Sequence, residues 1–173
     1  WGEAIYIDGK PTISTIRQIG GSANANDKNT FINWKHNIIV NNAGKILIEN
    51  NVINPLAANR SFVGISQQKC TDVTIKGNAI NRSNNGIMLF DNVGATVTVT
   101  LNTFNKNFLY DFAKYDDEAI RFENNLYLKT KIYTITNNEI YNVAIGLHGS
   151  NTNALIYNNT YHTDITVGDL NNY

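Results

Sequence analysis

The chain has 173 residues, enough for one domain with a continuous core. Charged residues make up only 16% of it, and 14 basic side chains balance 14 acidic ones. A chain without net charge has no basic field to attract nucleic acid, and no apolar run approaches the roughly 18 residues of a membrane span. We therefore expect neither a nucleic-acid partner nor membrane insertion.

Charged residues are few, and asparagine is frequent instead, with 30 residues, or about one in six. Asparagine is a poor former of helices and strands, but it tolerates the left-handed backbone of turns. Nine Tyr and seven Phe argue against disorder. The composition therefore predicts an ordered chain with many turns, and the single Cys70 leaves the redox compartment open.

In chain order, a short apolar block recurs. It reads AIY at 4–6, IIV at 38–40, GIS at 64–66, GIM at 86–88, AIR at 119–121 and GLH at 146–148. The segment 20–30 between the first two copies is polar, and we expect a loop there. Each later block is followed by a longer repeat, and Ile165 to Val167 may open one more unit.

Five octapeptides align without gaps: ILIENNVI at 46–53, VTIKGNAI at 73–80, VTVTLNTF at 97–104, YTITNNEI at 133–140 and ALIYNNTY at 154–161. Their third position is β-branched, and their eighth is large and apolar or aromatic. Their sixth position is always asparagine: Asn51, Asn78, Asn102, Asn138 and Asn159. Two strands, a tight bend carrying asparagine and a third short strand predict one coil of a three-faced helix.

Stacking explains why such a repeat would fold. One coil cannot bury its apolar face, but coils stacked about 4.8 Å apart bury that face against each other. Identical residues then lie above one another, so stacked asparagine amides can bond to neighbours and to the turn backbone. The sequence predicts an all-β, single-stranded, right-handed parallel β-helix of about five to six coils with an asparagine ladder. Because the chain begins with Trp1, we expect residues 1–173 to be a single domain of a longer chain.

These repeats resemble the pectate-lyase-like β-helix superfamily, which includes polysaccharide lyases, polygalacturonase-type hydrolases and phage tailspikes. The resemblance covers residues 37–167, and WGEAIYIDG at 1–9 also looks like one of its coils. It implies that substrate lies along one sheet, flanked by long loops. The longest connections, 54–63 and 105–118, would then flank a notch.

Alternation predicts two outward rows on the first sheet. The first row is Tyr6, Val40, Ser66, Met88, Arg121 and His148, and the second is Asp8, Asn42, Gln68, Phe90, Glu123 and Ser150. Arg121 and His148 should be neighbours one coil apart, with Glu123 beside them. Such a group can bind a sugar acid and move a proton, whereas the alternative is a solvated surface row. Tyr6 and Phe90 are candidate sugar-binding residues.

The loop 105–118 adds further candidates. Lys114 joins Arg121, His148 and Glu123 as a catalytic candidate, and Tyr110 and Tyr115 could stack on sugar rings. The acids Asp116, Asp117 and Glu118 are candidate Ca²⁺ ligands, because hard cations prefer carboxylate oxygens. The resemblance to calcium-dependent lyases implies an Arg or Lys as proton abstractor, for which Arg121 and Lys114 are the plausible positions. The alternative is an ordered loop with its aromatics packed and its acids solvated.

Three functions remain open. The first is an enzyme that cleaves an acidic polysaccharide by β-elimination, with hydrolysis the weaker variant because Asn-Thr-Asp and Gly-His-Gly do not occur in the sequence. The second is a segment of a tailspike or adhesin that binds surface polysaccharide, and the third is a structural spacer. We expect an extracellular, cell-surface or virion-surface location, a monomer for a lyase and a homotrimer for a tailspike.

Overall fold

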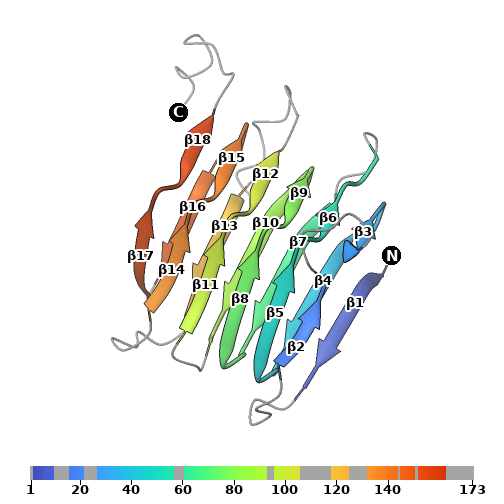
Figure 1. Ribbon diagram of the computed structural model, residues 1–173, viewed down its shortest axis with the longest axis horizontal. Coiled ribbons are helices and arrows are strands. Elements are labelled where there is room, and N and C mark those ends of the chain that lie inside the picture. Colours follow the sequence, from blue (N-terminus) through green and yellow to red (C-terminus); the bar gives the residue numbers. More distant parts are fainter. Residues whose placement is uncertain are drawn as a thin grey trace.

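The computed structural model describes residues 2–9, 16–21, 27–56, 61–92, 96–105, 118–124, 132–143, 145–150 and 152–162. These residues form 18 strands in three parallel sheets of six strands each (Figure 1). Each sheet takes one strand from each of six coils, so the prediction of a parallel β-helix is confirmed. Within the described ranges, no helix is long and apolar enough to cross a membrane.

Sheet A follows the order β1–β4–β7–β10–β13–β16 and contains β1 (Glu3–Asp8), β4 (His36–Asn41), β7 (Ser61–Gln68), β10 (Ser83–Phe90), β13 (Glu118–Glu123) and β16 (Ile145–Ser150). Sheet B contains β2 (Ile16–Ile19), β5 (Lys45–Glu49), β8 (Asp72–Lys76), β11 (Thr96–Thr100), β14 (Ile132–Thr136) and β17 (Asn153–Tyr157). Sheet C contains β3 (Thr30–Phe31), β6 (Val52–Ile53), β9 (Ala79–Asn81), β12 (Thr103–Asn105), β15 (Glu139–Tyr141) and β18 (Thr160–His162).

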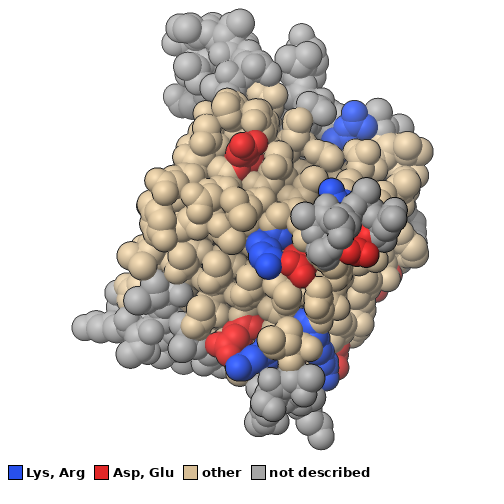
Figure 2. Space-filling model, viewed as in Figure 1, with Lys and Arg blue, Asp and Glu red and all other residues tan. Residues whose placement is uncertain are grey.

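The core consists of columns of like side chains. In sheet B, one inward column runs from coil to coil through Ile19, Ile48, Ile75, Val99, Ile135 and Ile156. Its four inner members are fully buried. The coils therefore bury one another's apolar faces, as the repeat predicts. The outer surface is sparsely charged, and Figure 2 shows only scattered acidic and basic side chains on the face turned to the viewer.

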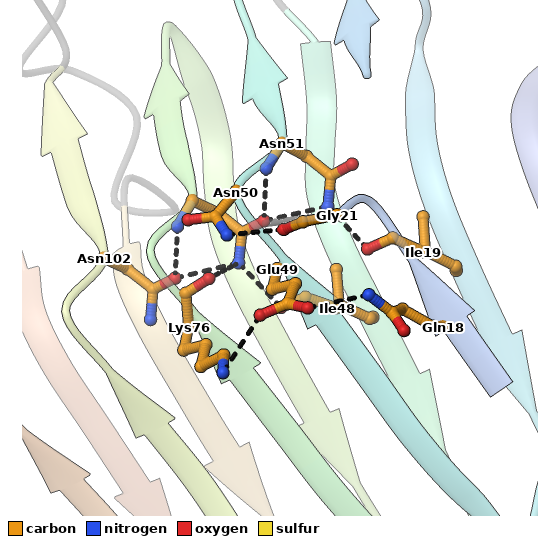
Figure 3. A network of polar contacts seen from close by, with 10 residues as sticks. Gln18, Ile19, Gly21, Ile48, Glu49, Asn50, Asn51, Lys76 and Asn102 are labelled. Carbon is orange, nitrogen blue, oxygen red and sulfur yellow. Dashed lines mark hydrogen bonds and ion pairs between the residues drawn. The ribbon is translucent and has the colours of Figure 1, made fainter. Parts of the chain in front are cut away.

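The asparagine ladder runs inside the bend between sheets B and C. Each amide nitrogen donates to the amide oxygen of the next coil: Asn51 to Asn78 at 2.9 Å, Asn78 to Asn102 at 3.0 Å, Asn102 to Asn138 at 3.1 Å and Asn138 to Asn159 at 2.8 Å. The same oxygens also accept the backbone N–H of the preceding coil's asparagine. Figure 3 shows part of this ladder with Asn51 and Asn102 labelled, next to the contacts of Glu49 with Gln18 and Lys76.

A sixth member of the ladder was not predicted. Asn29 donates its amide to Asn51 at 2.9 Å, although Asn29 lies within segment 20–30, where only a loop was expected. The left-handed position is also not the ladder asparagine itself but the residue before it. In the five aligned octapeptides those residues have positive φ: Asn50, Gly77, Leu101, Asn137 and Asn158.

The outward rows of sheet A differ from the prediction in β4. Val40 is fully buried, and the residue level with Tyr6 and Ser66 is Ile39. The second row likewise contains Asn41 where Asn42 was expected. A shift of one residue exchanges the two faces of a strand, so Val40 belongs to the core and not to the outward row. The expected connection 54–63 is also shorter, because β7 already begins at Ser61.

Candidate functional site

Two neighbouring strands of sheet A, β13 and β16, bring together the residues that could take part in a reaction. Arg121 and His148 are register partners on these strands, which confirms that they lie one coil apart. The closest polar contact joins Oε1 of Glu118 to Nδ1 of His148 at 2.6 Å. The Glu118 side chain is only 5% exposed, whereas that of His148 is 40% exposed. The result is a buried carboxylate under a solvent-accessible imidazole.

A local break in alternation explains why Glu118 and Arg121 share a face. Ala119 and Ile120 are both buried although they are consecutive, so the alternation of inward and outward side chains is interrupted between them. Ala119 is level with Gly86 of the preceding coil. A Cβ on Gly86 would lie 2.5 Å from the backbone oxygen of Ala119 and 2.6 Å from Phe104, so this position of the column has no room for a side chain. Ala119, the small residue that opens the AIR block, therefore marks the bend that turns Glu118 toward His148.

Arg121 lies between two carboxylates. Its Nε and Nη2 contact Oε1 of Glu123 at 2.8 Å and 2.7 Å, and its Nη1 is 3.8 Å from Oε2 of Glu118. Its guanidinium also lies 6.0 Å from the ring centre of Phe90, within the range of a cation–π contact. Arg121 is thus held in one orientation and balances part of the negative charge of Glu118 and Glu123.

The Glu118 contact sets the protonation pattern of the imidazole. An ionised carboxylate only accepts hydrogen bonds, so Nδ1 of a neutral His148 must carry the proton that Glu118 receives. Nε2 is then unprotonated and can accept a proton, as in a general base oriented by a carboxylate. Because His148 is partly exposed, a bound molecule can reach this nitrogen.

Oε2 of Glu118 is a second notable atom. It is buried and has no hydrogen-bond partner. The 3.8 Å that separates it from Arg121 is too long for a hydrogen bond. This buried oxygen is therefore left without a hydrogen-bond partner beside the dyad of Glu118 and His148.

The other predicted residues are distributed differently. Phe90 lies beside Arg121, but Tyr6 lies in the first coil, at the opposite end of sheet A. Lys114, Tyr110, Tyr115, Asp116 and Asp117 lie outside the described residues, as does the notch expected beside loop 105–118. The two remaining histidines have aromatic partners: His36 lies edge-on to Phe62, and His162 stacks on Tyr141 at 4.3 Å.

A calcium site finds little support in this part of the chain. Among the described residues, no group of three or more His, Cys, Asp and Glu is placed to hold a metal ion. Glu118, the only predicted ligand within them, already uses Oε1 to bind His148. The predicted calcium site of Asp116, Asp117 and Glu118 therefore stays a prediction, because Asp116 and Asp117 lie outside the described residues.

The partnership of Glu118 and His148 was missed by sequence reasoning, which assigned Glu118 to metal binding. The signal was the AI pair at 119–120, a small residue followed by a core residue, which places the preceding side chain at the bend. No family model, curated protein or solved structure matches the chain. The function is therefore argued from the geometry of the site.

Proposed function

We propose that this protein is a carbohydrate-active β-helix, related to the pectate-lyase-like superfamily, that binds an acidic polysaccharide on sheet A and cleaves it by β-elimination. The observation that carries the proposal is the 2.6 Å contact between Glu118 and His148 on the outer side of the sheet. A rigid sheet that orients an exposed imidazole through a buried carboxylate provides a general base at a fixed position. From the proposed substrate we infer that the protein is extracellular or a component of a cell or virion surface.

In the proposed reaction, Nε2 of His148 takes the proton from C5 of a uronic acid residue. The electron pair of the C5–H bond becomes the C4–C5 double bond, the C4–O4 bond breaks, and O4 leaves and takes up a proton from solvent. Arg121 lies one coil from His148 and supplies positive charge for the uronate carboxylate, on which negative charge accumulates. The geometry favours His148 as the base and Arg121 as the cation that faces the uronate, because a guanidinium paired with carboxylates stays protonated and cannot take the C5 proton.

The net negative charge of the site affects whether the reaction needs an added cation. Two carboxylates face one guanidinium, so an incoming uronate adds to a local excess of negative charge. An added cation would reduce this repulsion, and calcium is the cation that the family resemblance suggests. No step of the proposed reaction depends on calcium, and assays with and without it measure its contribution.

The test is a panel of acidic and neutral polysaccharides, each with and without calcium. Ultraviolet absorbance of the unsaturated product reports elimination, and reducing ends without that absorbance report hydrolysis. We expect His148→Ala to lower kcat/KM about 100-fold or more, the usual contribution of a general base. Glu118→Gln should also lower kcat, and Arg121→Ala should abolish the absorbance. Full activity in His148→Ala would remove the base from the mechanism.

His162→Ala is the matched control. His162 is an exposed histidine of sheet C that stacks on Tyr141, away from the strands that carry the dyad. Its replacement should leave elimination unchanged. A loss of activity equal to that of His148→Ala would point to a general effect on folding.

The second candidate is a tailspike or adhesin segment that binds surface polysaccharide without cleaving it. The ion pairs of Arg121 favour it, because a guanidinium held by two carboxylates suits a rigid binding surface as well as a reactive one. Binding of a polysaccharide without any product in either readout would support this candidate. A homotrimer in solution would add to that support, and absence of both binding and product would leave a structural spacer.

A further inference from the structure

One edge of the Arg121 guanidinium is occupied by a carboxylate of the protein itself. Nε and Nη2 lie on this edge, and both contact Oε1 of Glu123, at 2.8 Å and 2.7 Å. The edge presents two parallel N–H groups, which match the two oxygens of a carboxylate. Glu123 thus takes the position at which an arginine binds an acidic ligand in bidentate fashion.

The pairing of Arg121 with Glu123 leaves room for a better partner. One oxygen of Glu123 faces both nitrogens, whereas a fork-to-fork pair gives each N–H an oxygen of its own. Glu123 is restrained, because it lies only two residues from Arg121 on the same strand, β13. A carboxylate that arrives from solvent is free of this restraint and can form both parallel bonds.

The two carboxylates around Arg121 differ in how easily a ligand can displace them. The Glu118 side chain is largely buried and is held by His148 at 2.6 Å. The Glu123 side chain is 25% exposed, and its partner Arg121 is 31% exposed. Ion pairs that are open to solvent contribute little to stability. Glu123 is therefore the carboxylate that a ligand can replace on Arg121.

We propose that Glu123 is a specificity-determining residue, whose carboxylate occupies the place of the substrate uronate on Arg121 until the substrate displaces it. This inference rests on the proposed function, since it takes a uronate as the ligand of Arg121. A neutral sugar has no carboxylate to exchange and finds Arg121 already paired. A uronate can make the exchange, but it loses affinity because the displaced carboxylate repels it.

The alternative is that Glu123 only orients Arg121 for the ligand. The two roles predict changes of opposite sign when the charge of Glu123 is removed. Loss of an orienting partner loosens the guanidinium and weakens uronate binding, whereas loss of a competitor strengthens it. Glu123→Gln separates the two roles, because glutamine keeps the shape of the side chain and an oxygen that accepts hydrogen bonds.

Isothermal titration calorimetry of the whole chain measures this sign. The probes are oligomers of galacturonic, glucuronic and mannuronic acid, with oligomers of glucose as the neutral probe. We expect Glu123→Gln to bind an acidic oligomer about fivefold more tightly, or more, than the parent protein at low salt. The gain should shrink as salt rises, because salt screens the repulsion that was removed. For an oligomer that the protein cleaves, the same gain should appear as a lower KM.

Glu139→Gln is the matched control. It removes one carboxylate charge from sheet C, where Glu139 accepts a hydrogen bond from Tyr141 at 3.0 Å. It should leave the affinity for acidic oligomers unchanged. Glu123→Asp keeps the charge beside Arg121 and should give no comparable gain.

Three results would overturn the inference: weaker or unchanged binding in Glu123→Gln, an equal gain in Glu139→Gln, or no binding of any acidic oligomer by either the parent or Glu123→Gln. The proposed function fails in a different way. Tighter binding in Glu123→Gln without unsaturated product from any of the proteins would support the role of Glu123 and reject the elimination reaction.

Discussion

At the scale of single residues, the bend before each ladder asparagine requires a left-handed backbone. Asparagine or glycine occupies this position in four of the five aligned coils, but Leu101 occupies it in the fourth coil with φ of 57°. A left-handed conformation costs a residue with a Cβ about 1–2 kcal/mol, and asparagine can offset part of that through local hydrogen bonds. The Leu101 side chain is 62% exposed, so it contributes little to the core.

Leu101→Asn should therefore stabilise the protein. We expect the free energy of unfolding in urea to rise by about 1 kcal/mol, the part of the left-handed cost that asparagine relieves. Leu101→Ala is the control, because alanine keeps a Cβ in the same strained position and should give no comparable gain. A variant with asparagine that is no more stable than the parent would show that Leu101 is not strained.

Tyr133 is a second informative residue. Burial raises the pKa of its phenol above the ordinary value of 10.0, while hydrogen bonds with Asn92 and Asn124 oppose this shift. With a raised pKa in the folded state, the stabilisation from the neutral phenol is complete below the unfolded pKa. It is lost as pH rises through the folded pKa, because the unfolded chain ionises first.

Stability should consequently fall as pH rises above about 10. Tyr133→Phe should make this alkaline decline shallower, and at neutral pH it should lower stability because Asn92 and Asn124 lose a buried partner. Urea unfolding at neutral and alkaline pH measures both effects. The pKa of Tyr161 is also raised by burial, so Tyr161→Phe is a useful comparison. An alkaline decline that Tyr133→Phe leaves unaltered would contradict the assignment.

At the scale of structural elements, the ladder ties the coils together through buried polar groups. Asn102 shows the pattern: its oxygen accepts from the backbone N–H and the amide of Asn78, and its amide donates to Asn138. Removing it leaves several buried donors and acceptors without partners. Each such group costs about 1–3 kcal/mol.

Asn102→Ala should therefore lower the free energy of unfolding by about 3 kcal/mol or more. Asn159→Ala should cost less, about 1 kcal/mol, because Asn159 is only partly buried and water can replace the lost contacts. Parallel urea titrations of the two variants give the comparison. Equal losses at both positions would indicate that the ladder contributes no more inside the helix than at its end.

Another element, the small-residue column of sheet A, links the fold to the site. Gly64, Gly86, Ala119 and Gly146 are level with one another in successive coils. At this column the alternation of inward and outward side chains is interrupted. The residue that precedes the column residue in the strand can therefore face the outer side of the sheet. The bend that allows close contact between sheets A and C therefore also places Glu118 beneath His148.

At the scale of the whole molecule, most of the fold could be predicted because each residue type repeats at one position of the coil. The aligned octapeptides predict which residues of sheets B and C are level in successive coils. Alternation likewise predicts the pairing of Arg121 with His148, which is confirmed. Asn29 was missed because the polar segment 20–28 separates it from the strand that normally precedes a ladder residue. The NTF at 29–31 repeats the NTF at 102–104 and was the available signal.

The errors have a common physical origin. In β4 the small-residue column is occupied by a buried asparagine, Asn37, so the IIV block was aligned one residue too late and Val40 was assigned to the wrong face. The contact of Glu118 with His148 depends on a change of strand phase that simple alternation does not contain. Periodicity thus predicts the regular parts of the coil, whereas the site depends on its irregular positions.

The central claim is that coil stacking places Glu118 against Nδ1 of His148 and leaves Nε2 as a base. Nitrogen-detected NMR of the imidazole, at a pH where it is neutral, tests this directly. We predict a His148 with a protonated Nδ1 and an unprotonated Nε2, and a change in that pattern in Glu118→Gln. A neutral His148 protonated at Nε2, or one indifferent to Glu118→Gln, would contradict the proposed site.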